Sequence, residues 1–268
     1  MPKINVYLPD DLATAVREAH LSVSSICQQA LAAAVSTVGA AREAAAVLRE
    51  PAFDPHEQPQ TTAWLVSHMT PRLRQALCRA RDLAGEPHRV ATEHLLVGIL
   101  DEPDNLGAQV LRLLDIDIPE LRAAATHACD EHGRRDSTRR SRAKRPRADS
   151  DGHGQPGDED VVGGLAIGAR LAVAAAVEAA IDLGHSFLGC EHLLLALAGQ
   201  TDETAGKLLH DRHVEPEHIR RSATAALAGI AVGYSHARRT PPAAVAGRID
   251  DIDRRVDELE KRLNAGGL

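Results

Sequence analysis

The sequence predicts a mainly α-helical protein divided into several small units. Alanine supplies much of the 44% hydrophobic content of the 268 residues, whereas aromatic residues make up only 2%. This composition suits closely packed helices, because alanine has the highest helix propensity and a sheet sandwich needs larger side chains in its core. Apolar residues also recur at helical spacing, as in Leu95, Leu96, Ile99 and Leu100. One segment of the chain resembles a later one, which indicates an internal duplication.

The first expected elements are a short strand over residues 3–8 and two helices. The apolar face of the strand carries Ile4, Val6 and Leu8, and its polar face carries Lys3, Asn5 and Tyr7. Pro9 favours the first turn of one helix, and Ser22 is a suitable cap for the next. One strand and two helices bury too little surface to fold alone, so we expect two chains to pair as a homodimer.

Residues 1–50 resemble the ribbon-helix-helix family of bacterial repressors and antitoxins. The resemblance rests on the alternating strand, the proline after it and the Ser-Val-Ser-Ser sequence that starts the second helix. It implies contacts to the base edges of a double-stranded DNA operator from one set of residues, and a phosphate held by backbone amides of another. The first set is Lys3, Asn5 and Tyr7, and the second is Ser24 and Ser25. Because this segment is not basic, its use for dimerisation alone is the alternative.

Residues 129–162 are expected to form a flexible linker. Residues 134–147 hold eight basic side chains against one acidic side chain, and an acidic, glycine-rich stretch follows. Blocks of like charge beside glycine, serine and proline bury too little apolar surface to fold. We expect a solvated tether, with a non-specific phosphate-binding arm as the alternative.

The duplicated segment centres on a Glu-His-Leu-Leu motif. The motif occupies residues 93–96 and again 191–194, an offset of 98 residues, and the same offset aligns Leu121 with Ile219. Each copy is expected to contain four helices, the second of which starts at the motif. Two such units can bury their apolar faces against each other as one pseudo-twofold domain.

The two copies resemble the paired repeats of the Clp N-terminal domain, which precedes the ATPase rings of ClpA- and ClpC-type unfoldases. The resemblance is carried by Met69-Thr70-Pro71-Arg72 and by the two motifs, and it covers about residues 68–128 and 163–228. A long charged insert separates the copies here, whereas the family joins them by a short connection. Whether the repeats pack within one chain or between chains is therefore open.

These patterns divide the chain into seven segments. They are a ribbon-helix-helix segment (1–50), a linker (51–67), the first repeat (68–128), the charged linker (129–162), the second repeat (163–230), a linker (231–244) and a coiled-coil helix (245–264). The coiled coil is expected because apolar residues alternate spacings of three and four there. We expect it to reinforce a dimer formed elsewhere, with packing onto the chain's own helices as the alternative.

The Clp resemblance implies a ligand site contributed by both repeats. Its residues would be Met69, Thr70, Glu93, Leu165, Arg170 and Glu191. In ClpC-type domains the motif glutamate contacts phosphoarginine on marked substrates, and the groove between the repeats binds cyclic-peptide antibiotics. The second pocket departs from the family pattern, because Ala166 and Cys190 stand where the family has threonines. Capping of the two helix starts by the glutamates is the alternative role.

The sequence lacks the motifs of several enzyme classes. No segment matches GxxxxGK[ST], and His94 and His192 do not form a zinc-binding HExxH pattern. We expect a non-enzymatic protein without cofactor or metal, in which backbone groups satisfy the two histidines. The four cysteines are expected to be free, mostly buried thiols. Without a signal peptide or an apolar run of spanning length, a cytoplasmic location without a membrane partner is expected.

Two hypotheses of function follow. The first is a dimeric, autoregulatory DNA-binding transcription regulator whose repeats bind a peptide-like ligand, a phosphoarginine tag or a cyclic peptide. The alternative is a decoy or adaptor that sequesters ligands from the ClpC unfoldase or delivers substrates to it, with Clp protease components as partners. An antitoxin is disfavoured, because the rest of the chain resembles a folded domain.

Overall fold

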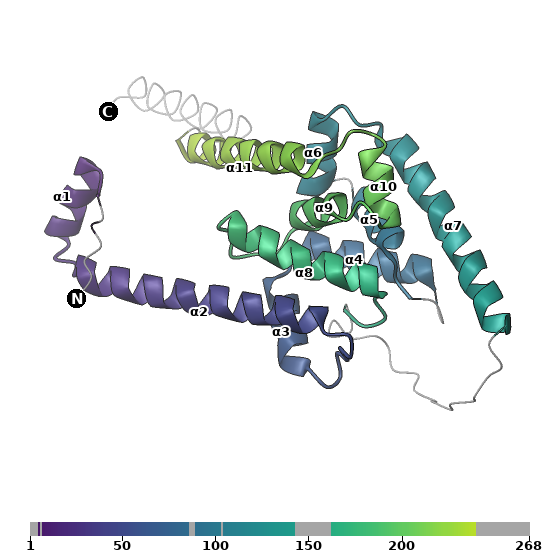
Figure 1. Ribbon diagram of the computed structural model, residues 1–268. Helices are drawn as coiled ribbons and strands as arrows, with labels where there is room; N and C mark the ends of the chain where they lie inside the picture. The colour runs from purple at the N-terminus through teal and green to yellow at the C-terminus, as the bar shows by residue number, and fades with distance from the viewer. Residues whose placement is uncertain (1–4, 6, 86–88, 103, 143–161, 240–268) are drawn as a thin grey trace, which may run out of the picture.

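The computed structural model describes residues 5, 7–85, 89–102, 104–142 and 162–239, and apart from two isolated β-bridges their regular structure is α-helical (Figure 1). The helices are α1 (Asp10–Glu18), α2 (Val23–Arg49), α3 (Pro59–His68), α4 (Pro71–Ala84), α5 (Thr92–Leu100), α6 (Leu106–Leu113), α7 (Ile118–Arg142), α8 (Ile167–Asp182), α9 (Cys190–Gly199), α10 (Thr204–His210) and α11 (Pro216–Arg239). The prediction of a mainly α-helical protein is confirmed.

The first two helices start where the sequence indicates. α1 follows Pro9 and carries two aspartates in its first turn, where the helix dipole favours negative charge. α2 follows Ser22, although the serine side chain makes no capping hydrogen bond. Residues 5, 7 and 8 form no strand, and residues 3, 4 and 6 of the expected strand lie outside the described residues.

The N-terminal helices expose an unusual number of apolar side chains. No residue of α1 is buried, and seven large apolar side chains between residues 7 and 35 are at least 37% exposed. They are Tyr7, Leu12, Leu21, Val23, Ile26, Leu31 and Val35. This segment therefore lacks a complete apolar core within one chain.

The C-terminal part of α2 packs on α8 (Figure 1). Its buried residues are Ala41, Ala44, Ala45 and Leu48, and the small alanines let the two helices approach closely. By length and composition α2 is also the one described helix that could cross a membrane. Because its buried part covers another helix of the domain, we interpret it as a packing helix.

The two repeats, α4–α7 and α8–α11, pack within one chain. The stretch before α4 pairs with the stretch before α9, where Met69 bridges Leu188 through backbone hydrogen bonds of 2.7 and 2.8 Å. The stretch before α5 pairs in the same way with the stretch before α8, where Val90 bridges Leu165. The bridges occupy equivalent places in the two repeats, so the domain has pseudo-twofold symmetry.

The third helix of each repeat crosses to the other repeat. α6 lies against α9 and α11, and α10 lies against α5 and α7 (Figure 1). The crossing is close, since a Cβ on Gly107 would lie 3.1 Å from the carbonyl oxygen of Cys190. On the opposite side, the Ala205 N–H group donates to Thr92 Oγ1 at 3.4 Å. The buried side chains of both repeats consequently form one continuous core.

Several helices extend beyond the expected boundaries. α3 lies largely inside the expected linker 51–67 and buries Thr62 and Leu65. α7 runs to Arg142, within the expected charged linker, because arginine is a good helix former and extending an existing helix costs little. α11 likewise runs to Arg239. The expected coiled coil lies outside the described residues.

Candidate ligand site

The Glu-His-Leu-Leu motif starts α5 and α9, both of which lie in the interior of the domain. In each helix the motif histidine turns back toward the residue before the helix. His94 Nδ1 accepts a hydrogen bond from the Ala91 N–H group at 3.1 Å, and His192 Nδ1 accepts one from the Gly189 N–H group at 2.9 Å. The prediction that backbone groups satisfy the two histidines is confirmed.

In the first repeat the motif glutamate, Glu93, is buried and has a partner. Its Oε1 lies 2.9 Å from Nδ1 of His132 on α7, and Thr92 Oγ1 donates to its Oε2 at 3.3 Å. Burial and, to a lesser degree, the charge of Glu93 raise the pKa of the nearby Cys129 thiol to about 12. The carboxylate is therefore satisfied by groups of its own repeat.

In the second repeat the motif glutamate, Glu191, is buried and has no such partner on a neighbouring helix among the described residues. Its Oε1 makes no hydrogen bond to the described residues, and desolvation raises the pKa of its carboxyl group. His192 Nδ1 lies 3.3 Å away, but it already accepts the Gly189 N–H and has no proton to offer. Burial, reinforced by His185, lowers the pKa of His192 to about 3, so the imidazole is neutral. The 3.3 Å contact is accordingly no ion pair.

Among the described residues, His185, Glu191 and His192 form the one group with metal-ligand spacing. His185 Nδ1 lies 2.8 Å from His192 Nε2. Because His192 Nδ1 accepts a backbone N–H, the proton of the neutral ring sits on Nε2 and is donated to His185. A metal ion at Nε2 would have to displace this proton and leave an imidazolate. These residues do not fit a metal ion.

The predicted ligand residues at the helix starts lie at the two bridges. Met69 and Leu165 are both buried there. Thr70 caps α4, and its Oγ1 accepts a hydrogen bond from the Leu73 N–H group at 3.2 Å. Ala166 holds the equivalent position before α8 and has no side-chain cap. The departure of the second repeat from the family pattern therefore includes the loss of this cap.

The predicted ligand residue Arg170 on α8 is covered by the segment between α2 and α3. Its guanidinium carbon lies 5.5 Å from the centre of the Phe53 ring, and its Nε makes no hydrogen bond to the described residues. The counterpart in the first repeat, Arg74, lines an open pocket on α4 together with Cys78 and Arg79. The two halves of the predicted site thus differ, because one is open and the other is covered.

The two repeats match the family model of the Clp repeat (R) N-terminal domain, over residues 68–146 and 168–253. The match covers more than half of the chain and includes both motif helices. The chain belongs to the Clp N-terminal repeat family.

Relatives of this Clp N chain match about half of it. It is 29% identical over 134 residues to a probable ATP-dependent Clp protease ATP-binding subunit of Chlamydia pneumoniae, covering 49% of this chain and 13% of that protein. It is 31% identical over 130 residues to uncharacterized proteins of Mycobacterium tuberculosis and Mycobacterium bovis, covering 48% of this chain and 42% of each. The match thus spans less than half the length of these relatives.

One solved structure that is similar to part of this chain is the N-terminal domain of the caseinolytic protease associated chaperone ClpD from Arabidopsis thaliana. The two chains are 20% identical and superpose with a TM-score of 0.37. The match covers 61% of this chain and 96% of that domain.

The residues predicted to contact DNA lie before the Clp N repeats and outside the family match. Lys3 lies outside the described residues. Asn5 and Tyr7 are exposed, as are Ser24 and Ser25 in the first turn of α2. The family match does not extend to these residues, so DNA contact stays a prediction.

Three contacts of the Clp N domain were not predicted. They involve His132, which pairs with Glu93, Phe53, which covers Arg170, and Glu102, which is buried. Glu102 forms ion pairs with Arg72 and Arg79 of α4, the latter at 3.0 Å. Two arginines seven residues apart lie on one face of a helix, and this spacing was the available signal.

Proposed function

We propose that this Clp N chain is a non-enzymatic binding module that acts as a decoy or adaptor of the Clp protease system. The observation that supports this proposal is the packing of both repeats within one chain, with a motif glutamate buried at the start of α5 and of α9. Paired repeats need no second subunit to form a docking surface. A decoy would sequester ligands from the unfoldase, and an adaptor would deliver substrates to it.

The proposed ligand is a polypeptide marked with phosphoarginine. Its guanidinium group would take the place of the His132 imidazole at Glu93, because a planar guanidinium makes two charge-assisted hydrogen bonds to a carboxylate. Its phosphate would meet the arginines of α4, since Arg74 and Arg79 line the open pocket on that helix. A cyclic peptide bound in the groove between the repeats is the alternative ligand.

The first repeat is the better candidate for this ligand. In the second repeat Phe53 covers Arg170, and threonines of the family pattern are replaced by Ala166 and Cys190. We therefore expect one ligand to bind per chain, although the domain contains two repeats.

Calorimetric titration with a phosphoarginine-containing peptide tests this site. Glu93→Ala is expected to weaken binding about tenfold or more, because a lost charge-assisted pair costs roughly 1.5–3 kcal/mol. Glu217→Ala serves as the control, since Glu217 is 67% exposed on α11. Thermal melting of both variants verifies that they fold. An unchanged affinity of a folded Glu93→Ala protein would remove this pocket from the proposal.

A degradation assay separates a decoy from an adaptor. Purified chain is added to a ClpC-type unfoldase with its peptidase and a phosphoarginine-marked substrate. A decoy lowers the degradation rate in proportion to the ligand it removes, whereas an adaptor raises the rate. A rate that does not respond at saturating concentrations of the chain would contradict both roles.

A second role, self-association through α1 and α2, is favoured by the exposed apolar residues of this segment. In a homodimer, the same face of a second copy would cover them, and residues 3–8 of the two copies would have to pair into the ribbon that the sequence predicts before they could read DNA. Replacing both Leu31 and Val35 with glutamate is expected to convert a dimer to a monomer in analytical ultracentrifugation.

The DNA role is tested with a separate variant. Replacing Lys3, Asn5 and Tyr7 with alanine is expected to abolish binding to the DNA upstream of the coding region. The molar mass of the dimer in analytical ultracentrifugation is expected to stay the same. Specific DNA binding that survives this change would exclude the ribbon as the DNA-reading element.

A further inference from the structure

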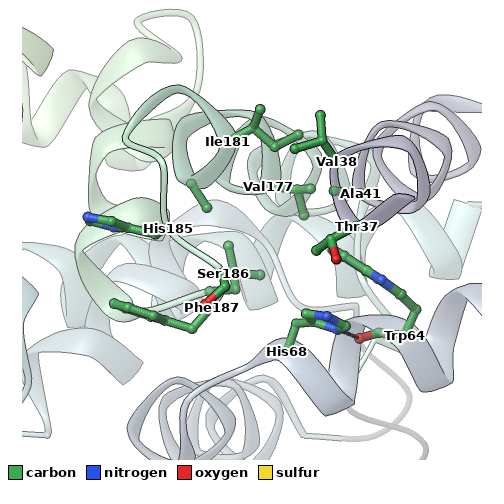
Figure 2. A pocket seen from close by; sticks show the side chains of 12 residues that line it. Thr37, Val38, Ala41, Trp64, His68, Val177, Ile181, His185, Ser186 and Phe187 are labelled. Carbon is green, nitrogen blue, oxygen red and sulfur yellow. Dashed lines mark hydrogen bonds between the residues drawn. The ribbon is translucent and has the colours of Figure 1, made fainter. Parts of the chain in front are cut away.

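An open pocket lies between the N-terminal helices and the second repeat (Figure 2). Its enclosed volume is about 40 Å³, well below the range of small-molecule pockets, and the rest of the opening is exposed to solvent, so it can hold only the end of one side chain. Thr37 and Ala41 of α2 and Trp64 of α3 form one side, and Val177 of α8 and Phe187 lie across from them. The family match begins at residue 68, so α2 and most of α3 lie outside it. The pocket is consequently lined in part by residues that precede the matched repeats.

The interior of this pocket suits an uncharged, apolar group. None of the residues that line it is an aspartate, glutamate, lysine or arginine. Burial lowers the pKa of His185 at its edge, which favours the neutral imidazole at physiological pH. Burying a charged ligand against such walls would cost several kcal/mol without a compensating partner.

Two aromatic stacks flank the pocket. The rings of Trp64 and His68 stack at 4.2 Å with an interplanar angle of 19°. The rings of His185 and Phe187 stack at 5.1 Å with an angle of 7°. Figure 2 shows the Trp64 side and the Phe187 side across the opening from each other. Flat aromatic walls and a small-residue floor fit an aromatic or branched aliphatic side chain.

The two histidines add polar groups suited to a peptide backbone. His68 Nδ1 lies 2.8 Å from the Trp64 carbonyl oxygen, so Nδ1 carries the proton and Nε2 is an acceptor. His185 Nδ1 accepts the proton of His192 Nε2, so its own Nε2–H is a donor. A peptide unit offers one N–H donor and one carbonyl acceptor. The two rings therefore complement a main-chain segment beside the pocket.

We propose that this pocket binds one apolar side chain, aromatic or branched aliphatic, of an extended polypeptide. The inference rests on the proposed function, because it names the feature of the polypeptide that the chain selects. It adds a second point of contact, separate from Glu93 and contributed half by the N-terminal helices. A marked polypeptide that also offers an apolar side chain to this pocket would bind more tightly than the mark alone.

Trp64 provides the measurement, because it is the one tryptophan of the chain. The probe is an acetylated and amidated Gly-Ser-Gly-Phe-Gly-Ser-Gly peptide, which contains no tryptophan. We expect its titration to shift the Trp64 emission and to saturate. The same peptide with aspartate in place of phenylalanine is expected to bind at least about tenfold more weakly, because it cannot use the apolar interior.

Two variants test the location of the bound side chain. Thr37→Leu fills the pocket from α2 and Phe187→Ala removes its opposite wall, and each is expected to weaken the phenylalanine peptide about tenfold. Ser36→Leu is the matched control, because Ser36 is the exposed neighbour of Thr37 and does not line the pocket. It is expected to leave the affinity unchanged. Circular dichroism and thermal melting show whether the variants are folded.

The outcomes separate this inference from the proposed function. The pocket proposal is contradicted if the phenylalanine peptide does not bind, or if it binds equally well to the unchanged protein and to both folded variants. Binding of the phosphoarginine peptide is expected to be weakened about tenfold or more in Glu93→Ala and to be unchanged in Thr37→Leu. The phosphoarginine peptide could fail to bind the unchanged protein and all variants while the phenylalanine peptide behaves as expected. The proposed ligand would then be wrong, and the binding of an apolar side chain in this pocket would be supported.

Discussion

Glu93 of the first repeat and Glu191 of the second occupy the same place in the motif, yet within the described residues only Glu93 pairs with a side chain of another helix. His132 pairs with Glu93 from α7, whereas Glu191 Oε1 is buried without a hydrogen bond. Both helices start with the same histidine contact to the backbone. The shared contact preserves the fold of each repeat, and the difference lies in whether the neighbouring carboxyl group has a side-chain partner.

The outer faces of α4 and α8 differ in a related way. α4 buries one face and leaves arginines exposed on the other, and Arg72 and Arg79 reach the buried Glu102. α8 is rich in alanine and buries a second face under α2. We interpret the first repeat as the one that retains ionic chemistry and the second as a platform for the N-terminal helices.

The first prediction concerns the close crossing of α4 and α5 in the first repeat. A Cβ on Gly98 would lie 2.2 Å from the backbone oxygen of Ala76, so the two helices must separate in a Gly98→Ala protein. The equivalent residue of the second repeat is Ala196. We expect the free energy of unfolding to fall by roughly 2 kcal/mol or more. Chemical denaturation measures this loss.

Gly39→Ala is the control for that substitution. Nothing lies within 4 Å of a Cβ on Gly39, which is inside the exposed part of α2. Alanine there is expected to be neutral or to stabilise the helix by up to about 1 kcal/mol. Equal effects of the two changes would show that the close crossing does not limit the first repeat.

The second prediction converts an ionic contact of the first repeat to the form found in the second. Glu102→Gln removes the carboxylate between Arg72 and Arg79, and Gln200 is the equivalent residue in the second repeat. Both arginines are nearly half exposed, so water can solvate them after the substitution and limits the cost. We expect the free energy of unfolding to fall by about 1–2 kcal/mol. Asp104→Asn, 75% exposed and 3.7 Å from Arg72, is the control and should change little. If Glu102→Gln leaves the free energy of unfolding unchanged, this ion pair does not stabilise α4.

The helical class and the family were predictable because their signals are local. Alanine content, apolar periodicity and the two Glu-His-Leu-Leu motifs each depend on neighbouring residues. The crossing of α6 and α10 to opposite repeats was not predictable in this way, since it depends on contacts between residues far apart in the chain. The helix α3 was missed because Pro59, which starts it, lies among residues typical of a linker.

The partners of the site residues could not be predicted from the sequence, because these contacts also join residues far apart in the chain. Glu93 was identified from the motif, but His132 lies 39 positions further on in a segment without a motif. Phe53 reaches Arg170 from a segment outside the repeats. Burial of Glu191 Oε1 without a hydrogen bond also depends on packing, which no spacing pattern reports.

The third prediction tests the opposite surroundings of the two motif glutamates. Glu93→Gln removes the carboxylate that pairs with His132, and we expect the free energy of unfolding to fall by roughly 1 kcal/mol at pH 7. Glu191→Gln removes a carboxyl group whose pKa is raised by desolvation, so we expect the free energy of unfolding to rise by a similar amount. Urea denaturation from pH 4 to pH 8 measures both.

The sign of the Glu191 effect depends on pH. Below the ordinary carboxyl pKa the group is protonated in both states and costs nothing. As the pH rises, the unfolded chain releases this proton first, so stability falls until the pH exceeds the raised pKa of the folded state. The advantage of Glu191→Gln should therefore grow from pH 4 upward. Destabilisation by both glutamine variants at pH 8 would contradict the difference between the repeats.

The smallest expected effect concerns the contact of α2 with the second repeat. Arg49 Nη1 lies 2.6 Å from Glu178 Oε1, and this hydrogen bond lowers the pKa of the Glu178 carboxyl. The stabilisation is present above the ordinary carboxyl pKa and is lost as the pH falls through the lowered value. Because both side chains are more than 40% exposed, Arg49→Met should cost less than about 1 kcal/mol at pH 7 and less still in high salt.

Leu48→Ala gives the comparison that interprets this small effect. Leu48 is fully buried on the same turn of α2, and its truncation should cost about 2–5 kcal/mol. If α2 is held by its apolar face, cooperative urea unfolding will respond strongly to Leu48→Ala and weakly to Arg49→Met. The reverse order would mean that an exposed ion pair secures the N-terminal helices, and the pocket around Trp64 would then be expected to open at low pH.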